Sequence, residues 1–190
     1  MERWRIQCAA RTLDAIASAM PQNVSLATRL ALFATSLAAV CTLALQPASA
    51  QTVIVVRHGE KLDASADSVL SPAGAARAER LANVLAASKV RAIYTTQYRR
   101  TILLAAPTAK RLDVTASVIP GKEMDTLMAK IRSHAKDDVV LVVGHSNTVP
   151  EILKALGVSA SVVVGEDEYD NLFVVAMQPN TAPTLVNLKY

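Results

Sequence analysis

The chain is poor in cysteine, in aromatic side chains and in clustered basic residues, and each shortage excludes a class of function. Its only two cysteines, Cys8 and Cys41, lie within the first 50 of 190 residues. Residues 51–190 therefore contain no disulfide, no thiol nucleophile and no cysteine-ligated metal site. Phe, Trp and Tyr make up 4% of the chain, and no basic stripe interleaved with aromatic residues is present. Nucleic-acid binding accordingly has no support in the sequence.

The first 50 residues have the pattern of a secretory signal. Arg29 precedes an uncharged apolar run over residues 30–45, and the small residues Ala48-Ser49-Ala50 follow. This is the order of positive region, apolar region and cleavage site. The run would span about 24 Å as a helix, less than the roughly 30 Å of a bilayer core, which disfavours a retained anchor. We expect residues 1–50 to be a signal peptide, with Met20 as an alternative start, and the protein to be periplasmic or extracellular.

After residue 50, apolar runs of strand length alternate with helical patterns. This alternation predicts right-handed βαβ crossovers and a three-layer α/β/α sandwich with a mostly parallel central sheet, in a single domain over residues 51–190. Pro107 is expected to kink its helix or to end the first segment of it. Strands are predicted over residues 52–56, 90–95, 114–119, 139–143, 172–177 and 184–188, and helices over residues 72–85, 96–112, 124–135 and 148–156.

Arginine and histidine side chains follow three of the predicted strands. Arg57 and His58 come directly after the first strand, Arg99 and Arg100 open the helix after the second, and His145 follows the fourth. Each has an ordinary explanation when it is taken singly. However, all lie at the carboxyl ends of parallel strands, where open α/β sheets bind ligands. We expect them to converge on one pocket, and two guanidinium groups favour a dianion such as phosphate.

These blocks resemble the motifs of the histidine phosphatase superfamily, which has the phosphoglycerate-mutase-like fold. Arg57-His58-Gly59 is similar to the family's signature after its first strand. Residues 94–101 resemble its second arginine motif, in which counting from Thr96 selects Arg100. Residues 142–147 resemble its second histidine motif. The three blocks occur in family order, and the resemblance covers most of residues 52–177.

The resemblance implies a phosphomonoesterase that requires no metal and no other cofactor. His58 would attack phosphorus and form a phosphohistidine, which water then hydrolyses. Arg57, Arg100 and His145 would bind the phosphoryl oxygens and stabilise their charge in the transition state. The expected partner is a small phosphomonoester, either a soluble phosphorylated compound or an envelope-linked phosphate.

The family often also has a carboxylate that protonates the leaving group, and its identity here stays open. Glu123 follows the third predicted strand and is the first candidate, ahead of Asp125. Glu60, two residues after His58, is another candidate. These acids have ordinary explanations as helix-start or rim residues, and short members of the family can lack a dedicated acid.

Three alternatives remain at this point. Residues 144–148 nearly match the elbow of serine hydrolases around Ser146, but no histidine follows His145, as that fold requires. His58, His145 and the acidic run at residues 166–168 could hold a metal, although the arginines would repel a cation. A catalytically weak module that binds phosphate or a phosphosugar on the same fold would need no nucleophile.

Overall fold

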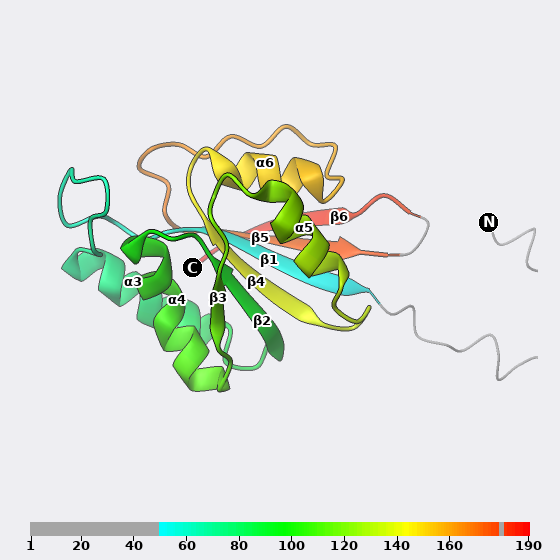
Figure 1. The fold of residues 1–190 in the computed structure, drawn as a ribbon, viewed down its shortest axis with the longest axis horizontal. Coiled ribbons are helices and arrows are strands. Elements are labelled where there is room, and N and C mark those ends of the chain that lie inside the picture. Colours follow the sequence, from blue (N-terminus) through cyan, green and yellow to red (C-terminus); the bar gives the residue numbers. More distant parts are fainter. Residues whose placement is uncertain (1–49, 179–180) are drawn as a thin grey trace, which may run out of the picture. The chain divides into compact units, whose positions relative to one another are not determined.

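The computed structural model describes residues 50–178 and 181–190, which fold around a six-stranded sheet (Figure 1). The predicted signal peptide therefore lies outside the described residues, except for Ala50. Neighbouring strands follow the order β3-β2-β4-β1-β5-β6. The first four strands in the chain pair in parallel, whereas β5 and β6 run antiparallel. The strands are β1 (Gln51–Arg57), β2 (Val90–Thr95), β3 (Ala116–Val118), β4 (Val139–Gly144), β5 (Asn171–Met177) and β6 (Thr184–Lys189).

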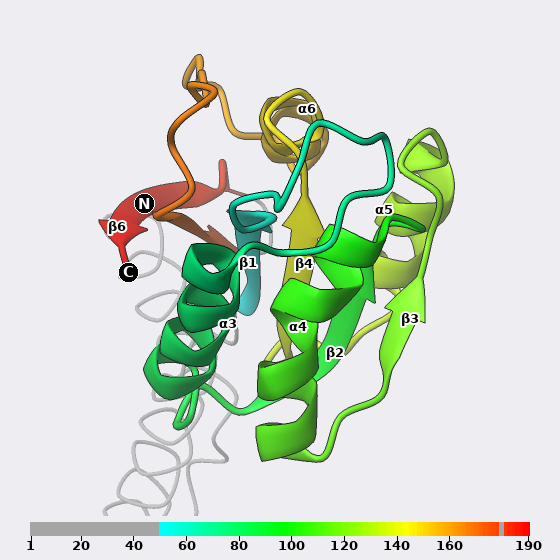
Figure 2. The same cartoon turned by 90° about the vertical axis from the view of Figure 1, so that its left-hand side faces the viewer.

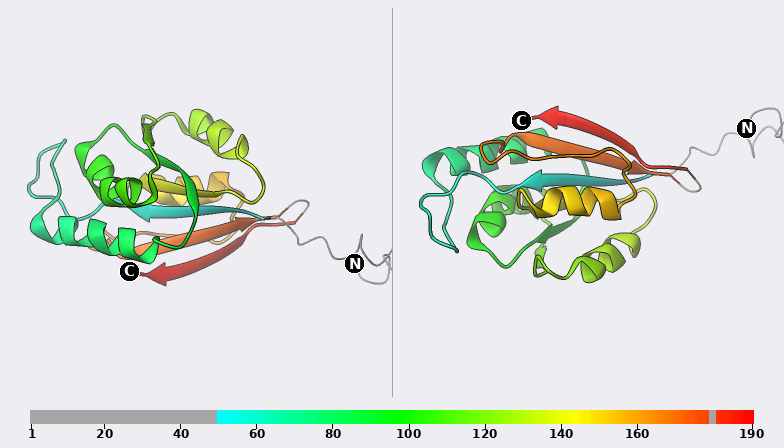
Figure 3. Two further views of the ribbon diagram at one scale, coloured as in Figure 1. Left: turned by 90° about the horizontal axis from the view of Figure 1, so that it is seen from below. Right: turned by 90° about the horizontal axis from the view of Figure 1, so that it is seen from above.

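Two helices cover each face of the sheet, as Figures 2 and 3 show. The pair α3 and α4 packs on one face, and the pair α5 and α6 packs on the other. This arrangement confirms the predicted α/β fold with a mostly parallel sheet. None of the helices in the described part of the chain has the length and apolar character needed to cross a membrane. The helices are α3 (Pro72–Val84), α4 (Arg99–Leu112), α5 (Met124–Arg132) and α6 (Thr148–Ala155).

Strand β1 contributes to the core on both sides of the sheet. Val53 and Val55 belong to the cluster formed with α5 and α6, whereas Ile54 and Val56 belong to the cluster formed with α3 and α4. Successive side chains of a strand point to opposite faces, so a run of β-branched residues suits a strand that is covered twice. This double burial holds the carboxyl end of β1, where Arg57 lies, in a defined position.

Several elements have other bounds than the sequence predicts. Strand β3 covers only Ala116–Val118 and lies at the edge of the sheet. Helix α4 begins at Arg99 rather than at residue 96 and runs through Pro107 to its predicted end at Leu112, and α5 ends at Arg132 rather than at residue 135. The proline lacks an amide hydrogen for the carbonyl of Leu103. Leu103 is 40% exposed, so this turn of the helix lies on its accessible side, where water can replace the missing amide donor.

The start of α3 packs directly against the loop that follows β1. Ser71 caps the helix by accepting a hydrogen bond from the amide of Gly74 at 3.1 Å, and its own amide donates to the carbonyl of Glu60 at 2.9 Å. A Cβ atom on Gly74 would lie 2.5 Å from the Glu60 carbonyl oxygen. Only glycine therefore permits this approach of the helix to the loop that carries His58.

We expect Gly74→Ala to lower the free energy of unfolding by about 1–3 kcal/mol, because the added methyl group forces the loop and the helix apart. Urea denaturation of the two proteins measures the difference. Ala76→Ser, at an exposed position of the same helix, is the control and should change stability by less than about 0.5 kcal/mol. Equal stability of Gly74→Ala and the parent chain would contradict the close contact.

Candidate active site

The pairing of β1 with β4 brings His58 and His145 together. Arg57 lies opposite Gly144 in the last register position, and the His58 amide donates to the Gly144 carbonyl at 2.9 Å. The next residue on each strand is a histidine, and the centroids of the two rings lie 5.2 Å apart. Both histidines are buried.

Arg100 reaches the same place from the first turn of α4. Its Nη2 atom lies 3.4 Å from Nδ1 of His145, and its guanidinium lies over the Tyr98 ring at 4.5 Å. Arg99 does not line this pocket: it is exposed, and its backbone amide donates to Asp67. The structure therefore brings together the four predicted residues in one pocket of about 600 Å³. Its walls include Arg57, His58, Lys61, Tyr98, Arg100, Lys122, His145, Ser146, Glu151, Glu166 and Tyr169.

The hydrogen bond of His58 defines its tautomer. Its Nδ1 atom lies 2.7 Å from the carbonyl oxygen of Gly59. A carbonyl can only accept, so Nδ1 carries the proton and Nε2 keeps a free lone pair. An imidazole with an unprotonated Nε2 facing a polar pocket is a competent nucleophile.

The hydrogen bonds of His145 define the opposite tautomer. Arg100 can only donate, so Nδ1 of His145 accepts and Nε2 carries the proton. Nε2 lies 2.9 Å from the hydroxyl of Thr96, which lies 3.0 Å from the hydroxyl of Thr101. Thr101 in turn donates to the carbonyl of Tyr98 at 2.8 Å. This chain of buried hydroxyl groups orients the His145 ring and leaves its Nδ1 atom toward Arg100.

Both histidines are neutral at neutral pH. The pKa of His58 is lowered to about 4, mainly by burial and also by the positive charges of Arg100 and Arg57, against the opposing effect of the Gly59 hydrogen bond. Burial lowers the pKa of His145 to about 3, helped by His58 and the two arginines. An uncharged His58 retains the lone pair that nucleophilic attack requires.

Arg57 is 3% exposed and holds the loop that precedes β5. Its Nη1 atom donates to the carbonyls of Gly165 at 2.6 Å and Glu166 at 2.7 Å, and its Nη2 atom pairs with the Glu166 carboxylate at 3.2 Å. Its guanidinium lies 4.2 Å from the Tyr169 ring centroid. The Nε atoms of Arg57 and Arg100 have no hydrogen-bond partner within the described residues. A bound oxyanion can satisfy guanidinium donors in this pocket.

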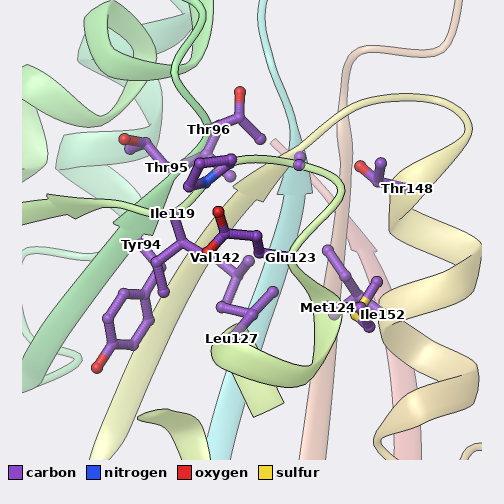
Figure 4. A pocket seen from close by; sticks show the side chains of 14 residues that line it. Tyr94, Thr95, Thr96, Ile119, Glu123, Met124, Leu127, Val142, Thr148 and Ile152 are labelled. Carbon is purple, nitrogen blue, oxygen red and sulfur yellow. The ribbon is translucent and has the colours of Figure 1, made fainter. Parts of the chain in front are cut away.

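The two predicted acids do not line the pocket that contains the histidines. Glu60 accepts three hydrogen bonds from Arg77, the shortest at 2.6 Å, and these bonds hold its pKa below the usual range. A carboxylate that is held ionised is poorly suited to donate a proton. Glu123 lies at the start of α5 and lines a separate, mainly apolar pocket between the sheet, α5 and α6 (Figure 4).

Sequence reasoning considered residues 166–168 only as possible metal ligands and missed the loop before β5 as part of the pocket that contains the arginines. Leu172 of β5 pairs with Val56 of β1 in an antiparallel register, so the residues just before β5 must pass the carboxyl end of β1. This places Glu166 and Tyr169 beside Arg57. The direction of β5 decides this placement, and the local sequence does not give it; a parallel strand would have carried the loop to the other end of the sheet.

The structure also bears on two of the alternatives. The Ser146 hydroxyl donates to Glu166 at 3.1 Å, and no histidine of the described residues makes a hydrogen bond with it, as a serine hydrolase would require. Within residues 50–178 and 181–190, no three His, Cys, Asp or Glu side chains are grouped so that they could hold a metal ion.

Comparison with known proteins gives a family and a set of related folds. Residues 53–126 match the family described as the histidine phosphatase superfamily (branch 1). No curated protein sequence matches the chain. Among solved structures, the protein histidine phosphatase SixA complexed with tungstate is similar with a TM-score of 0.61 and 18% identity, covering 73% of this chain and 96% of that one.

Two further structures share the fold at similarly low identity. Phosphoserine phosphatase from Entamoeba histolytica, in complex with 3-phosphoglyceric acid, has a TM-score of 0.58 and 15% identity, covering 74% of this chain and 97% of that one. The mycobacterial glucosyl-3-phosphoglycerate phosphatase has a TM-score of 0.56 and 14% identity, covering 67% and 90%. The family match supports a phosphatase enzyme. Residues 53–126, from β1 to the start of α5, thus match the histidine phosphatase superfamily, and the chain has the phosphoglycerate-mutase-like fold.

Proposed function

We propose that the protein is an exported phosphomonoesterase that acts through a phosphohistidine on His58. One observation carries this proposal: a buried, neutral histidine presents an unprotonated Nε2 in a pocket that also contains the guanidinium groups of Arg57 and Arg100. The arginines attract a phosphate dianion, and the imidazole supplies the nucleophile. A site that only binds phosphate would need the arginines but not the nucleophilic imidazole.

The reaction that this geometry supports has two steps. In the first, the Nε2 lone pair of His58 forms a bond to phosphorus, while the ester P–O bond breaks and its electron pair leaves with the alcohol oxygen. In the second, water attacks phosphorus and the P–N bond breaks, which returns the electron pair to Nε2 and releases phosphate. Arg57 and Arg100 offset the charge on the phosphoryl oxygens in both steps.

His145 acts on a phosphoryl oxygen once a substrate is bound. In the free site its Nδ1 atom has a lone pair and cannot donate. A bound dianion within a few ångströms raises the pKa of the imidazole, because opposite charge favours the imidazolium form. Nδ1–H then donates to the phosphoryl oxygen, while Nε2–H still donates to Thr96.

The lining of the pocket supports a small, polar substrate. The pocket is open and contains amide and hydroxyl side chains, with Lys61 and Lys122 adding positive charge. We infer that it takes a small phosphorylated compound or the phosphate of an envelope component. A panel of such phosphomonoesters, ranked by kcat/KM, identifies the preferred class.

We expect His58→Ala to abolish turnover of an aryl phosphate, because the other unprotonated imidazole nitrogen of the pocket, Nδ1 of His145, already accepts a hydrogen bond from Arg100. Brief incubation of the parent chain with labelled substrate, followed by alkaline quenching, should yield a peptide phosphorylated on His58. Turnover by His58→Ala at more than a small fraction of the parent rate would refute the mechanism.

Two adjacent arginines provide the matched control for this experiment. Arg100→Ala should reduce kcat by about 10²–10³-fold, since it removes charge-assisted donors from the transition state. Arg99→Ala removes the same side chain from an exposed position and should leave kcat within about twofold of the parent. Similar losses from both variants would show that net positive charge, rather than the Arg100 contact, matters.

The lowered histidine pKa values predict how stability depends on pH. In the unfolded chain His58 and His145 titrate near 6.5, but in the folded chain they titrate near 4 and 3. Between these values the unfolded state binds more protons, so the free energy of unfolding should fall as the pH decreases from about 6.5 toward 4. NMR titration of the two imidazoles in the substrate-free protein tests this directly. A midpoint near 6.5 for either folded residue would contradict it.

The proposed export rests on the order of charges and apolar residues in residues 1–50. Cleavage after Ala50 would produce a protein that begins at Gln51, the first residue of β1. N-terminal sequencing of the protein recovered from outside the cytoplasmic membrane should therefore begin at Gln51. Recovery only inside the cells, with residues 30–45 retained, would refute export.

A further inference from the structure

The geometry points to Glu166 as the residue that protonates the leaving group. This inference rests on the phosphoryl transfer proposed above and names the acid that the sequence left open. Glu166 lies in the loop between α6 and β5 and lines the same pocket as His58 and His145.

Two hydrogen-bonding groups hold the Glu166 carboxylate at the pocket. Its Oε2 atom lies 3.2 Å from Nη2 of Arg57, and its Oε1 atom accepts a hydrogen bond from Ser146 at 3.1 Å. The backbone of the same residue is fixed by Arg57 Nη1, which donates to its carbonyl oxygen at 2.7 Å. A carboxylate oriented by two groups from β1 and the β4–α6 turn can deliver a proton in a defined direction.

The other carboxylates are less well placed for this step. Glu60 is bound by Arg77, and Glu123 lines the apolar pocket of Figure 4. Glu151 lines the histidine pocket from the first turn of α6, but within the described residues it makes no side-chain hydrogen bond that would orient it. Among the carboxylates that line this pocket, Glu166 is therefore the one whose orientation is fixed by hydrogen bonds.

The direction of the reaction favours the same residue. In-line displacement places the leaving oxygen on the side of phosphorus opposite Nε2 of His58. His58 is 5% exposed, so attack from this buried residue directs the leaving oxygen toward the more exposed part of the pocket lining. The Glu166 side chain belongs to that lining, is 83% exposed and pairs with Arg57.

The proton that Glu166 delivers comes from water. A phosphoryl dianion bound beside Arg57 shares the guanidinium with the Glu166 carboxylate and places negative charge next to it, which favours transfer of a proton from water to that carboxylate. As the P–O bond breaks, that proton passes to the leaving oxygen, which departs as the alcohol. The resulting carboxylate can accept a proton from the water that hydrolyses the phosphohistidine.

The test compares a good and a poor leaving group. Glu166→Gln keeps the shape of the side chain but removes the acid. We expect it to reduce kcat/KM for an alkyl phosphate such as glycerol 2-phosphate by about 10²-fold or more. For p-nitrophenyl phosphate, whose phenolate leaves without a proton, the loss in kcat/KM should be below about fivefold. In a two-step mechanism kcat/KM depends only on steps up to the formation of the phosphohistidine, so slow hydrolysis of that intermediate does not affect it.

Two matched variants serve as controls. Asp167→Asn removes the neighbouring carboxylate of the same loop, which is exposed and does not line the pocket. Glu123→Gln removes the acid favoured by the sequence. Both should leave the ratio of kcat/KM values for the two substrates unchanged. In addition, Glu166→Gln should show a burst of p-nitrophenol, because the phosphohistidine would be hydrolysed more slowly without a base.

The remaining outcomes separate a failure of the role of Glu166 from a failure of the proposed phosphatase function. Equal losses on both substrates, no loss on either, or a gain on both would overturn the role of Glu166 as the acid. A selective loss in Glu123→Gln would transfer the role to that residue. In all of these cases, labelling of His58 by p-nitrophenyl phosphate would leave the proposed phosphatase function intact. Absence of that label in the parent chain would instead remove the proposed function itself.

Discussion

The parallel pairing of β1 with β4 is the constraint on which the site depends. The last pair of residues in this register is Arg57 and Gly144, and in each strand the next residue is a histidine. The Thr148 hydroxyl accepts a hydrogen bond from the His145 amide. A Cβ atom on Gly144 would lie only 2.8 Å from this hydroxyl, so a larger residue there would disturb the bond. A slip of one residue in this register would move every β1 side chain to the opposite face and separate the two imidazoles.

Burial and positive charge act together in this pocket. Each lowers the pKa of His58, so the nucleophile is neutral without a neighbouring base. The same two arginines that lower it also attract the phosphoryl group that it attacks. The site therefore needs no separate activating residue for His58, provided that its Nδ1–H keeps donating to the Gly59 carbonyl.

Arg57 has both a structural and a chemical task. It holds the loop before β5 through the Gly165 and Glu166 carbonyls, and it also faces the phosphate pocket. Binding of a substrate to Arg57 is consequently coupled to the state of the Glu166 carboxylate, which shares the same guanidinium. Through Arg57, the binding of a dianion is thus linked to the proton that Glu166 delivers to the leaving group.

The sequence by itself determined the layers of the fold and four of the residues in the pocket. Strand runs and helical periodicity are local patterns, and parallel strands bring their carboxyl ends to one edge. Thus Arg57, His58, Arg100 and His145 could be named from spacing and motif. Their tautomers could not, because these depend on partners such as Thr96 that are remote in the chain.

Only the tertiary structure decided which acidic residues accompany them. Glu60 and Glu123 are near the motifs in sequence, but Arg77 and the start of α5 hold them outside the pocket. Glu166 is 109 residues from Arg57 and reaches it because β5 runs antiparallel to β1. Strand direction is set by packing of the whole sheet rather than by local propensity, so no pattern around Glu166 could reveal its neighbour.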